Sequence, residues 1–162
     1  MSILLSDASL KTYKQLLPAS LSIMRKAEEH FKNNGTNLND LAEMRLIEDM
    51  APLTFQVFSI VHHSVGAIEA LRTGEFSPPK MPDDLSFNDL IDLLEDAKEN
   101  LNHTSNEEID SFSGREVMFR MGQIEWAFTA ENFILSFSLP NFYFHVTTTV
   151  SYTHLTLPTI LL

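Results

Sequence analysis

Apolar residues recur every three or four positions along most of this chain, and this periodicity constrains the fold more than any other feature. The first such stripe predicts a helix over Ser9–Asn33 and comprises Leu10, Tyr13, Leu17, Leu21, Met24, Ala27 and Phe31. A second long helix is predicted from Pro52 to Thr73, where Gly74 can end it in a left-handed conformation. A third is predicted over Phe87–Asn102, with Ser86 and Asp89 spaced as a capping box.

Two other segments complete the predicted architecture. Alternating apolar residues on either side of Gly122-Gln123 predict a β-hairpin between Gly114 and Phe128. A fourth helix is predicted over Ala130–Thr149, apolar nearly all round and kinked at Pro140, and a short helix over Leu38–Leu46. The sequence therefore predicts an all-α protein, a four-helix bundle with a small β-hairpin before its last helix.

The composition limits the classes of partner and compartment. A chain of 162 residues is about one domain, and with no cysteine it has no disulfide and no cysteine-type zinc site. Its formal net charge of −11 would repel nucleic acid and anionic lipid, so neither is expected as a partner. No apolar run approaches the roughly 20 residues that span a bilayer, and a cytoplasmic protein is expected.

Two long motifs resemble a known family. One runs from Arg45 to Val57 and reads RLIEDMAPLTFQV, and the other runs from Leu139 to Thr149 and reads LPNFYFHVTTT. They resemble the DUF1993 family, which is placed near the DinB/YfiT-like four-helix bundles. The resemblance covers residues 1–149 and implies the same bundle fold.

The DinB-like resemblance also implies a divalent metal, zinc or nickel, held by three histidines, two of them one turn apart on the last helix. Some proteins of that group are hydrolases or thiol transferases. This chain departs from the pattern, because His145 is followed four residues later by Thr149, a poor ligand for either metal. The candidate metal ligands that remain from the resemblance are therefore His62 and His145.

The histidines also have simpler interpretations. Projected at 100° per residue, His62 and His63 fall on either side of the core stripe of their helix, which predicts flanking or exposed side chains. His145 is expected to be a buried histidine whose ring nitrogens are satisfied by Asn141, Thr148 and Thr149. His30 is expected to serve the end of the first helix. Asp49 is expected either to pair with Arg45 in a local salt bridge or to cap the second helix.

The last residues resemble something other than protein-coding sequence. The stretch VSYTHLTLPT, from Val150 to Thr159, is similar to a translated sequencing adaptor, and residues 150–162 carry no charged side chain. We therefore expect one domain over residues 1–149, a non-native tail over 150–162 and a truncated fourth helix. The alternative is a genuine hydrophobic C-terminal segment. The sequence holds no complete catalytic set.

Three functional hypotheses follow. The first is a non-catalytic or small-ligand-binding protein with an incomplete DinB-type histidine site. The alternative is a divalent-metal-dependent hydrolase or thiol transferase that uses His145, one of His62 and His63, and a third ligand such as His30 or Asp49. The third is a structural homodimer.

Overall fold

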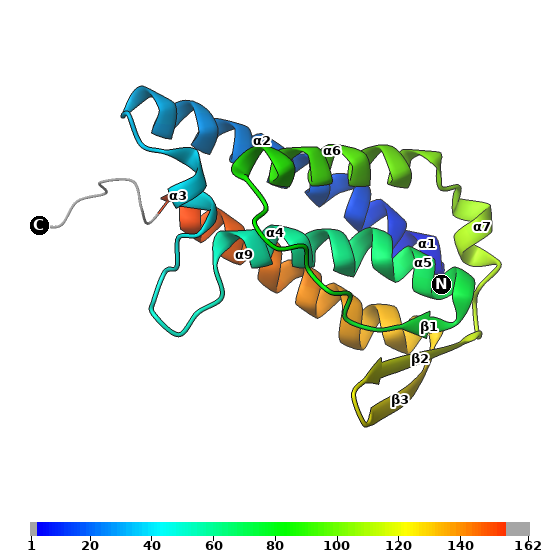
Figure 1. Ribbon diagram of the computed structural model, residues 1–162. Coiled ribbons are helices and arrows are strands. Elements are labelled where there is room, and N and C mark those ends of the chain that lie inside the picture. The colour runs from blue at the N-terminus through cyan, green and yellow to red at the C-terminus, as the bar shows by residue number, and fades with distance from the viewer. Residues whose placement is uncertain (1–2, 155–162) are drawn as a thin grey trace, which may run out of the picture.

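The fold is mostly helical, with a small sheet at one end (Figure 1). This computed structural model describes residues 3–154, with side chains as far as residue 152. Two long helices are continuous, α2 (Leu10–Asn33) and α6 (Phe87–His103). Each of the other two long segments contains a π-helical stretch: α4 (Leu53–Val61), η1 (His62–Gly66) and α5 (Ala67–Thr73), and α8 (Ala130–Asn132), η2 (Phe133–Ser138) and α9 (Leu139–His154).

The long segments pack side by side around one apolar core. α2 contacts α6 and α9, and α4 contacts α9 and α6. The stripe predicted for the first helix is buried throughout, with Leu10, Tyr13 and Leu17 fully enclosed. The predicted helical fold is confirmed. The helix count is not, because the short helices α1 (Leu5–Ala8), α3 (Leu38–Ala42) and α7 (Asn106–Asp110) join the long ones.

The small sheet has three strands in the order β1-β2-β3. The predicted hairpin is confirmed as β2 (Glu116–Met121) and β3 (Ile124–Thr129), and Gly122 turns between them with a φ of 61°. The third strand, β1 (Glu75–Phe76), pairs parallel to β2 and was not predicted. A strand of two residues is too short to show the alternation that identifies a strand in sequence.

Local signals fixed most helix ends. Ser86 and Asp89 form the predicted capping box at the start of α6, and Gly74 ends α5 with a φ of 80°. Asp49 does not cap α4, whose first residue follows Pro52 directly. Arg45 instead donates a hydrogen bond to the carbonyl of Met50 within the same loop.

The last helix extends past residue 149, the predicted end of the domain. α9 continues to His154, and Tyr152 is fully buried with its hydroxyl donating to the carbonyl of Ala51. The predicted tail thus lies partly inside the last helix. Its residues 155–162 lie outside the described part of the chain. In that part, no helix is both long enough and apolar enough to cross a membrane.

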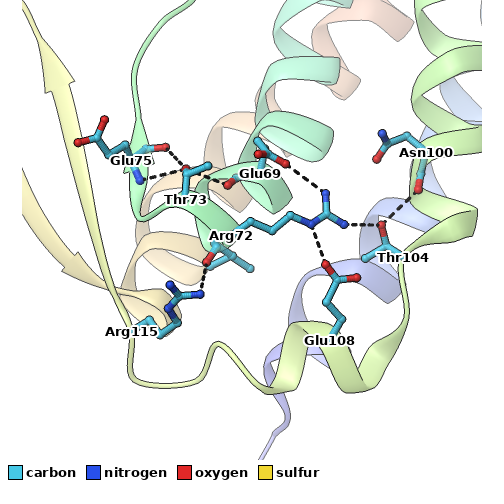
Figure 2. A network of polar contacts seen from close by, with 9 residues as sticks. Glu69, Arg72, Thr73, Glu75, Asn100, Thr104, Glu108 and Arg115 are labelled. Carbon is cyan, nitrogen blue, oxygen red and sulfur yellow. Dashed lines mark hydrogen bonds and ion pairs between the residues drawn. The ribbon is translucent and has the colours of Figure 1, made fainter.

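A polar network joins the helices at the end of the bundle that carries the sheet (Figure 2). Arg72 on α5 donates to Glu108 at 2.7 Å, to Glu69 at 3.3 Å and to the hydroxyl of Thr104 at 3.2 Å. Arg115 donates to the carbonyl of Leu71 at 3.4 Å. The network ties α5 to α7, to the end of α6 and to the chain entering β2.

Candidate functional site

A cavity of about 350 Å³ opens between α4, η1, η2, α9 and the sheet. Its walls are mainly aromatic, and they also include the segment that follows β1 and runs back toward α6 (Figure 1). Phe55, Met121 and Trp126 form a partly exposed rim, between 41% and 52% exposed. The full lining is Phe55, Phe58, Ser59, His62, His63, Phe76, Pro78, Pro79, Phe119, Met121, Trp126, Phe137, Asn141 and His145.

Three histidines meet in this cavity. The rings of His63 and His145 have centroids 5.9 Å apart and are nearly parallel, at 14°. The ring of His62 lies 5.2 Å from that of His63. The fold therefore brings the two predicted metal residues, His62 and His145, to the same cavity and adds His63 between the helices.

The prediction that His62 and His63 both lie off the core is wrong for His63, which is only 9% exposed. His62 is half-buried. Both residues begin the π-helical segment η1. A π turn contains one more residue than an α turn, so a projection at 100° per residue misplaces the faces there. π segments that interrupt α-helices are frequently found at functional sites.

The two π segments are joined directly. Ser138, the last residue of η2, donates its hydroxyl to the carbonyl of His63 at 2.8 Å. The buried hydroxyl of Tyr13 lies 3.1 Å from the same Ser138 oxygen. This pairing fixes the backbone of η1 against η2 and so positions His63 opposite α9.

His145 is buried, as predicted, but its polar partner is different. Its Nδ1 lies 2.8 Å from Oε1 of Gln56 on α4, a side chain that is 2% exposed. The hydroxyl of Thr149 donates to the carbonyl of His145, and Asn141 donates to that of Phe137, so neither bonds to the imidazole ring. Gln56 was missed because a lone glutamine on a helical stripe carries no sequence signal of its partner.

The orientation of the Gln56 amide follows from the hydrogen bond that its nitrogen makes. Its Nε2 donates to the carbonyl of Ala51 at 3.2 Å, and the reverse orientation would place two oxygens together. Oε1 therefore accepts from His145, and Nδ1 of His145 carries the proton. Nε2 of His145 is then the bare nitrogen of a neutral imidazole.

The other ring nitrogens have no partner within the described residues. Nε2 of His62 and Nδ1 of His63 are buried and unbonded. Burial lowers the pKa of His62 to about 4, of His63 to about 3 and of His145 to about 4, with neighbouring histidines adding to the effect for His62 and His63. All three imidazoles are therefore neutral at pH 7. Buried polar groups without partners are rare and costly, about 1–3 kcal/mol each.

The ring of His62 is held by two further residues that sequence reasoning missed. It stacks on Phe76 of β1, with centroids 4.2 Å apart and planes at 18°. A Cβ added to Gly66 would lie 2.9 Å from Nδ1 of His62. His62 and Phe76, together with Phe58 and Pro79, also line a second cavity of about 350 Å³.

The arrangement does not fit the three-ligand metal centre that the fold implies. Within residues 3–154, no three His, Asp or Glu side chains are grouped so that they could hold one ion. His30 bonds to Asn34 at the end of α2, and Asp49 lies in the loop before α4, so neither lines the histidine cavity. The two other ligands proposed for a metal are thus not brought to His145.

Comparison with known proteins agrees with this fold. A crystal structure of a DinB family protein from Shewanella denitrificans superposes with a TM-score of 0.77 at 20% identity, covering 96% of this chain and 88% of that one. No curated protein matches the sequence. The family model of the domain of unknown function DUF1993 matches residues 5–152, which includes both motifs and the cavity residues. The chain belongs to the DUF1993 family and has a DinB-like fold.

Proposed function

We propose that this protein binds a small, mainly apolar molecule in the cavity shared by His62, His63 and His145. One observation carries the proposal. Three neutral imidazoles line an aromatic cavity, and within the described chain only Nδ1 of His145 has a hydrogen-bond partner. Cavities of roughly 300–1,000 Å³ with apolar walls and a few convergent polar groups are typical ligand sites.

The walls and the rim support the same function. Phe76, Phe119 and Phe137 supply apolar surface from three different elements, so a bound molecule would be enclosed from several sides. Trp126 and Met121 on the hairpin are partly exposed at the opening. Exposed apolar side chains beside an opening would be covered by a ligand, which stabilises the complex by about 25 cal/mol per Å² of apolar surface removed from water.

The test uses neutral aromatic fragments of matched size: toluene, 4-methylanisole and p-cresol. A fragment present at ten times its dissociation constant stabilises the folded state by about 1.4 kcal/mol, which raises Tm by about 3–5 °C. Ser59→Phe fills the cavity from α4 and should abolish the shift. Ser22→Phe, at an exposed position of α2, is the matched control and should retain it. If no fragment raises Tm, or if the filled variant responds like the control, the protein does not bind ligands in this cavity.

The divalent-metal-dependent hydrolase or thiol transferase is the second candidate. The buried nitrogens of His62 and His63 without partners favour it, since imidazole nitrogens are good zinc and nickel ligands. The described side chains do not form a three-ligand group, which weighs against it. Metal analysis of the purified protein separates the two: stoichiometric zinc or nickel that is lost in His145→Ala would support the enzyme and overturn the metal-free ligand site.

A further inference from the structure

The chemistry of the cavity narrows the class of molecule that it can hold. Its lining contains no lysine, arginine, aspartate or glutamate among the described residues. A charged ligand group would therefore be buried without a counter-ion, which is strongly unfavourable. The overall charge of −11 adds repulsion against an anion.

One polar group of the cavity has a defined hydrogen-bonding role. The carbonyl of Ala51 orients the amide of Gln56, and Gln56 accepts the Nδ1 proton of His145. Nε2 of His145 is consequently an acceptor and cannot donate while the imidazole is neutral. Within the described chain no donor reaches that nitrogen. A ligand that satisfies it must bring its own O–H or N–H.

The surroundings of His145 favour an aromatic carrier for that donor. Phe55 contacts the imidazole edge to face, with ring centroids 5.8 Å apart, and the ring of Phe137 lies 5.9 Å from that of His63. Aromatic rings pack against such walls in offset or edge-to-face arrangements that add about 0.5–1.5 kcal/mol beyond area burial. A planar ring with one hydroxyl matches both the walls and the oriented acceptor of His145.

We propose that the cavity selects an uncharged aromatic molecule carrying a hydroxyl or N–H donor, with a phenol as the simplest case, and that this donor bonds to Nε2 of His145. This inference rests on the proposed ligand-binding function. Gln56 is its specificity-determining residue, because it sets which nitrogen of His145 is bare. Gln56 acts through His145 and is not required to touch the ligand.

The experiment compares p-cresol with ligands of similar shape in metal-free protein. Dissociation constants are measured from the indole N–H resonance of Trp126, the only tryptophan of the chain, which lines the cavity. p-Cresol should bind about tenfold tighter than 4-methylanisole, which lacks the donor, because one hydrogen bond is worth about that much. It should also bind tighter than toluene, 4-methylbenzoate and 4-methylbenzylamine. Equal affinity for p-cresol and 4-methylanisole, or tighter binding of either charged ligand, would overturn the inference while leaving a ligand site in place.

Two variants connect the preference to Gln56. Gln56→Leu frees the tautomer of His145 and should bring the affinities for p-cresol and 4-methylanisole to within about twofold of one another. Gln56→Met likewise removes the acceptor at Nδ1 and should have the same effect, which serves as the test if the leucine variant does not fold. Long-range ¹H–¹⁵N correlation on the unmodified protein gives an independent readout, since a proton found on Nε2 of His145 instead of Nδ1 contradicts the inference. Failure of every ligand to bind would instead refute the proposed function.

Discussion

Nδ1 of His145 lies 2.8 Å from Oε1 of Gln56, a residue 89 positions earlier in the chain. The bond crosses from α9 to α4 at the wall of the cavity, and both side chains are buried. It is the point at which the packing of the two helices determines the chemistry of the site. A buried bond of this kind also contributes to stability, because its loss leaves a donor without a partner.

We therefore expect Gln56→Ala to lower the free energy of unfolding by about 1–3 kcal/mol, the cost of an unsatisfied buried donor together with the lost packing. Denaturant unfolding followed by circular dichroism measures it. Gln123→Ala in the exposed hairpin turn is the control and should change stability by less than about 0.5 kcal/mol. Equal effects of the two variants would mean that the bond between Gln56 and His145 contributes nothing.

Gly66 and His62 should be energetically coupled. Gly66 has helical dihedral angles, with φ −61° and ψ −35°, so alanine should stabilise the helix by about 0.5–1 kcal/mol. The added Cβ would lie 2.9 Å from Nδ1 of His62, so the ring must leave its stack on Phe76. Gly66→Ala should therefore give no gain in the unmodified protein and should disturb the ring resonances of His62.

The double variant isolates this coupling. With His62→Ala already in place, the obstruction is gone and Gly66→Ala should show its full helical gain. Thermal unfolding of the four proteins measures the interaction energy. Additive effects would show that Gly66 is not needed for the position of the His62 ring.

The metal-free protein should lose stability in mild acid because of the buried histidines. Burial holds the pKa of His63 at about 3 and those of His62 and His145 at about 4, whereas unfolding returns them to about 6.5. Between about pH 6.5 and 4 the unfolded chain binds more protons, so the free energy of unfolding falls as pH falls. Within this window each histidine contributes at most about 1.4 kcal/mol per pH unit to the slope of the free energy of unfolding against pH. Above the window it contributes nothing to that slope.

Denaturant titrations from pH 7.5 to 5 would measure this slope. His63→Phe keeps an aromatic ring in place and removes one titrating group, so its slope should be smaller than that of the unmodified protein. Identical slopes would indicate that His63 is protonated in the folded state. The window lies above the pH at which most carboxylates titrate, which limits their contribution.

Arg72 should matter more to stability than the other surface arginines. It is 29% exposed and contacts Glu108, Glu69 and Thr104 (Figure 2). The two carboxylates raise the pKa of the guanidinium, with the hydrogen bond to Glu108 as the largest cause. Arg72→Ala should cost about 1–2 kcal/mol, since three partners lose their donor and the alkyl stem loses its packing. The matched control is Arg25→Ala, because Arg25 is 52% exposed and pairs with Glu95. This substitution should lower the free energy of unfolding by only about 0–1 kcal/mol.

Hydrogen exchange would show whether the Arg72 network also holds the sheet. The substitution Arg72→Ala should accelerate exchange of the β2 and β3 amides more than exchange of the α2 amides, because the network lies beside the entry to the hairpin. Uniform acceleration across the chain would indicate a global loss of stability alone. An unchanged hairpin would show that the sheet is held by its apolar contacts.

The sequence by itself determined the elements whose signals are local. The stripe from Leu10 to Phe31 predicted α2, Ser86 with Asp89 predicted the start of α6, and Gly122 with alternating neighbours predicted the hairpin. Each signal lies within one element, so periodicity or a cap is enough to read it. The two family motifs are local as well, and the family resemblance that they carry was confirmed by the match over residues 5–152.

Only the tertiary structure decided the site. His63 lies in the π-helical segment His62–Gly66 and lines the cavity, Glu75 and Phe76 form β1 by pairing with β2, and Gln56 bonds to His145 across 89 residues. None of these follows from residue spacing, because each is stabilised by a partner far away in the chain. The apolar pattern therefore determines which helices form, whereas the packing of α4 against α9 determines which nitrogen of His145 has a hydrogen-bond partner.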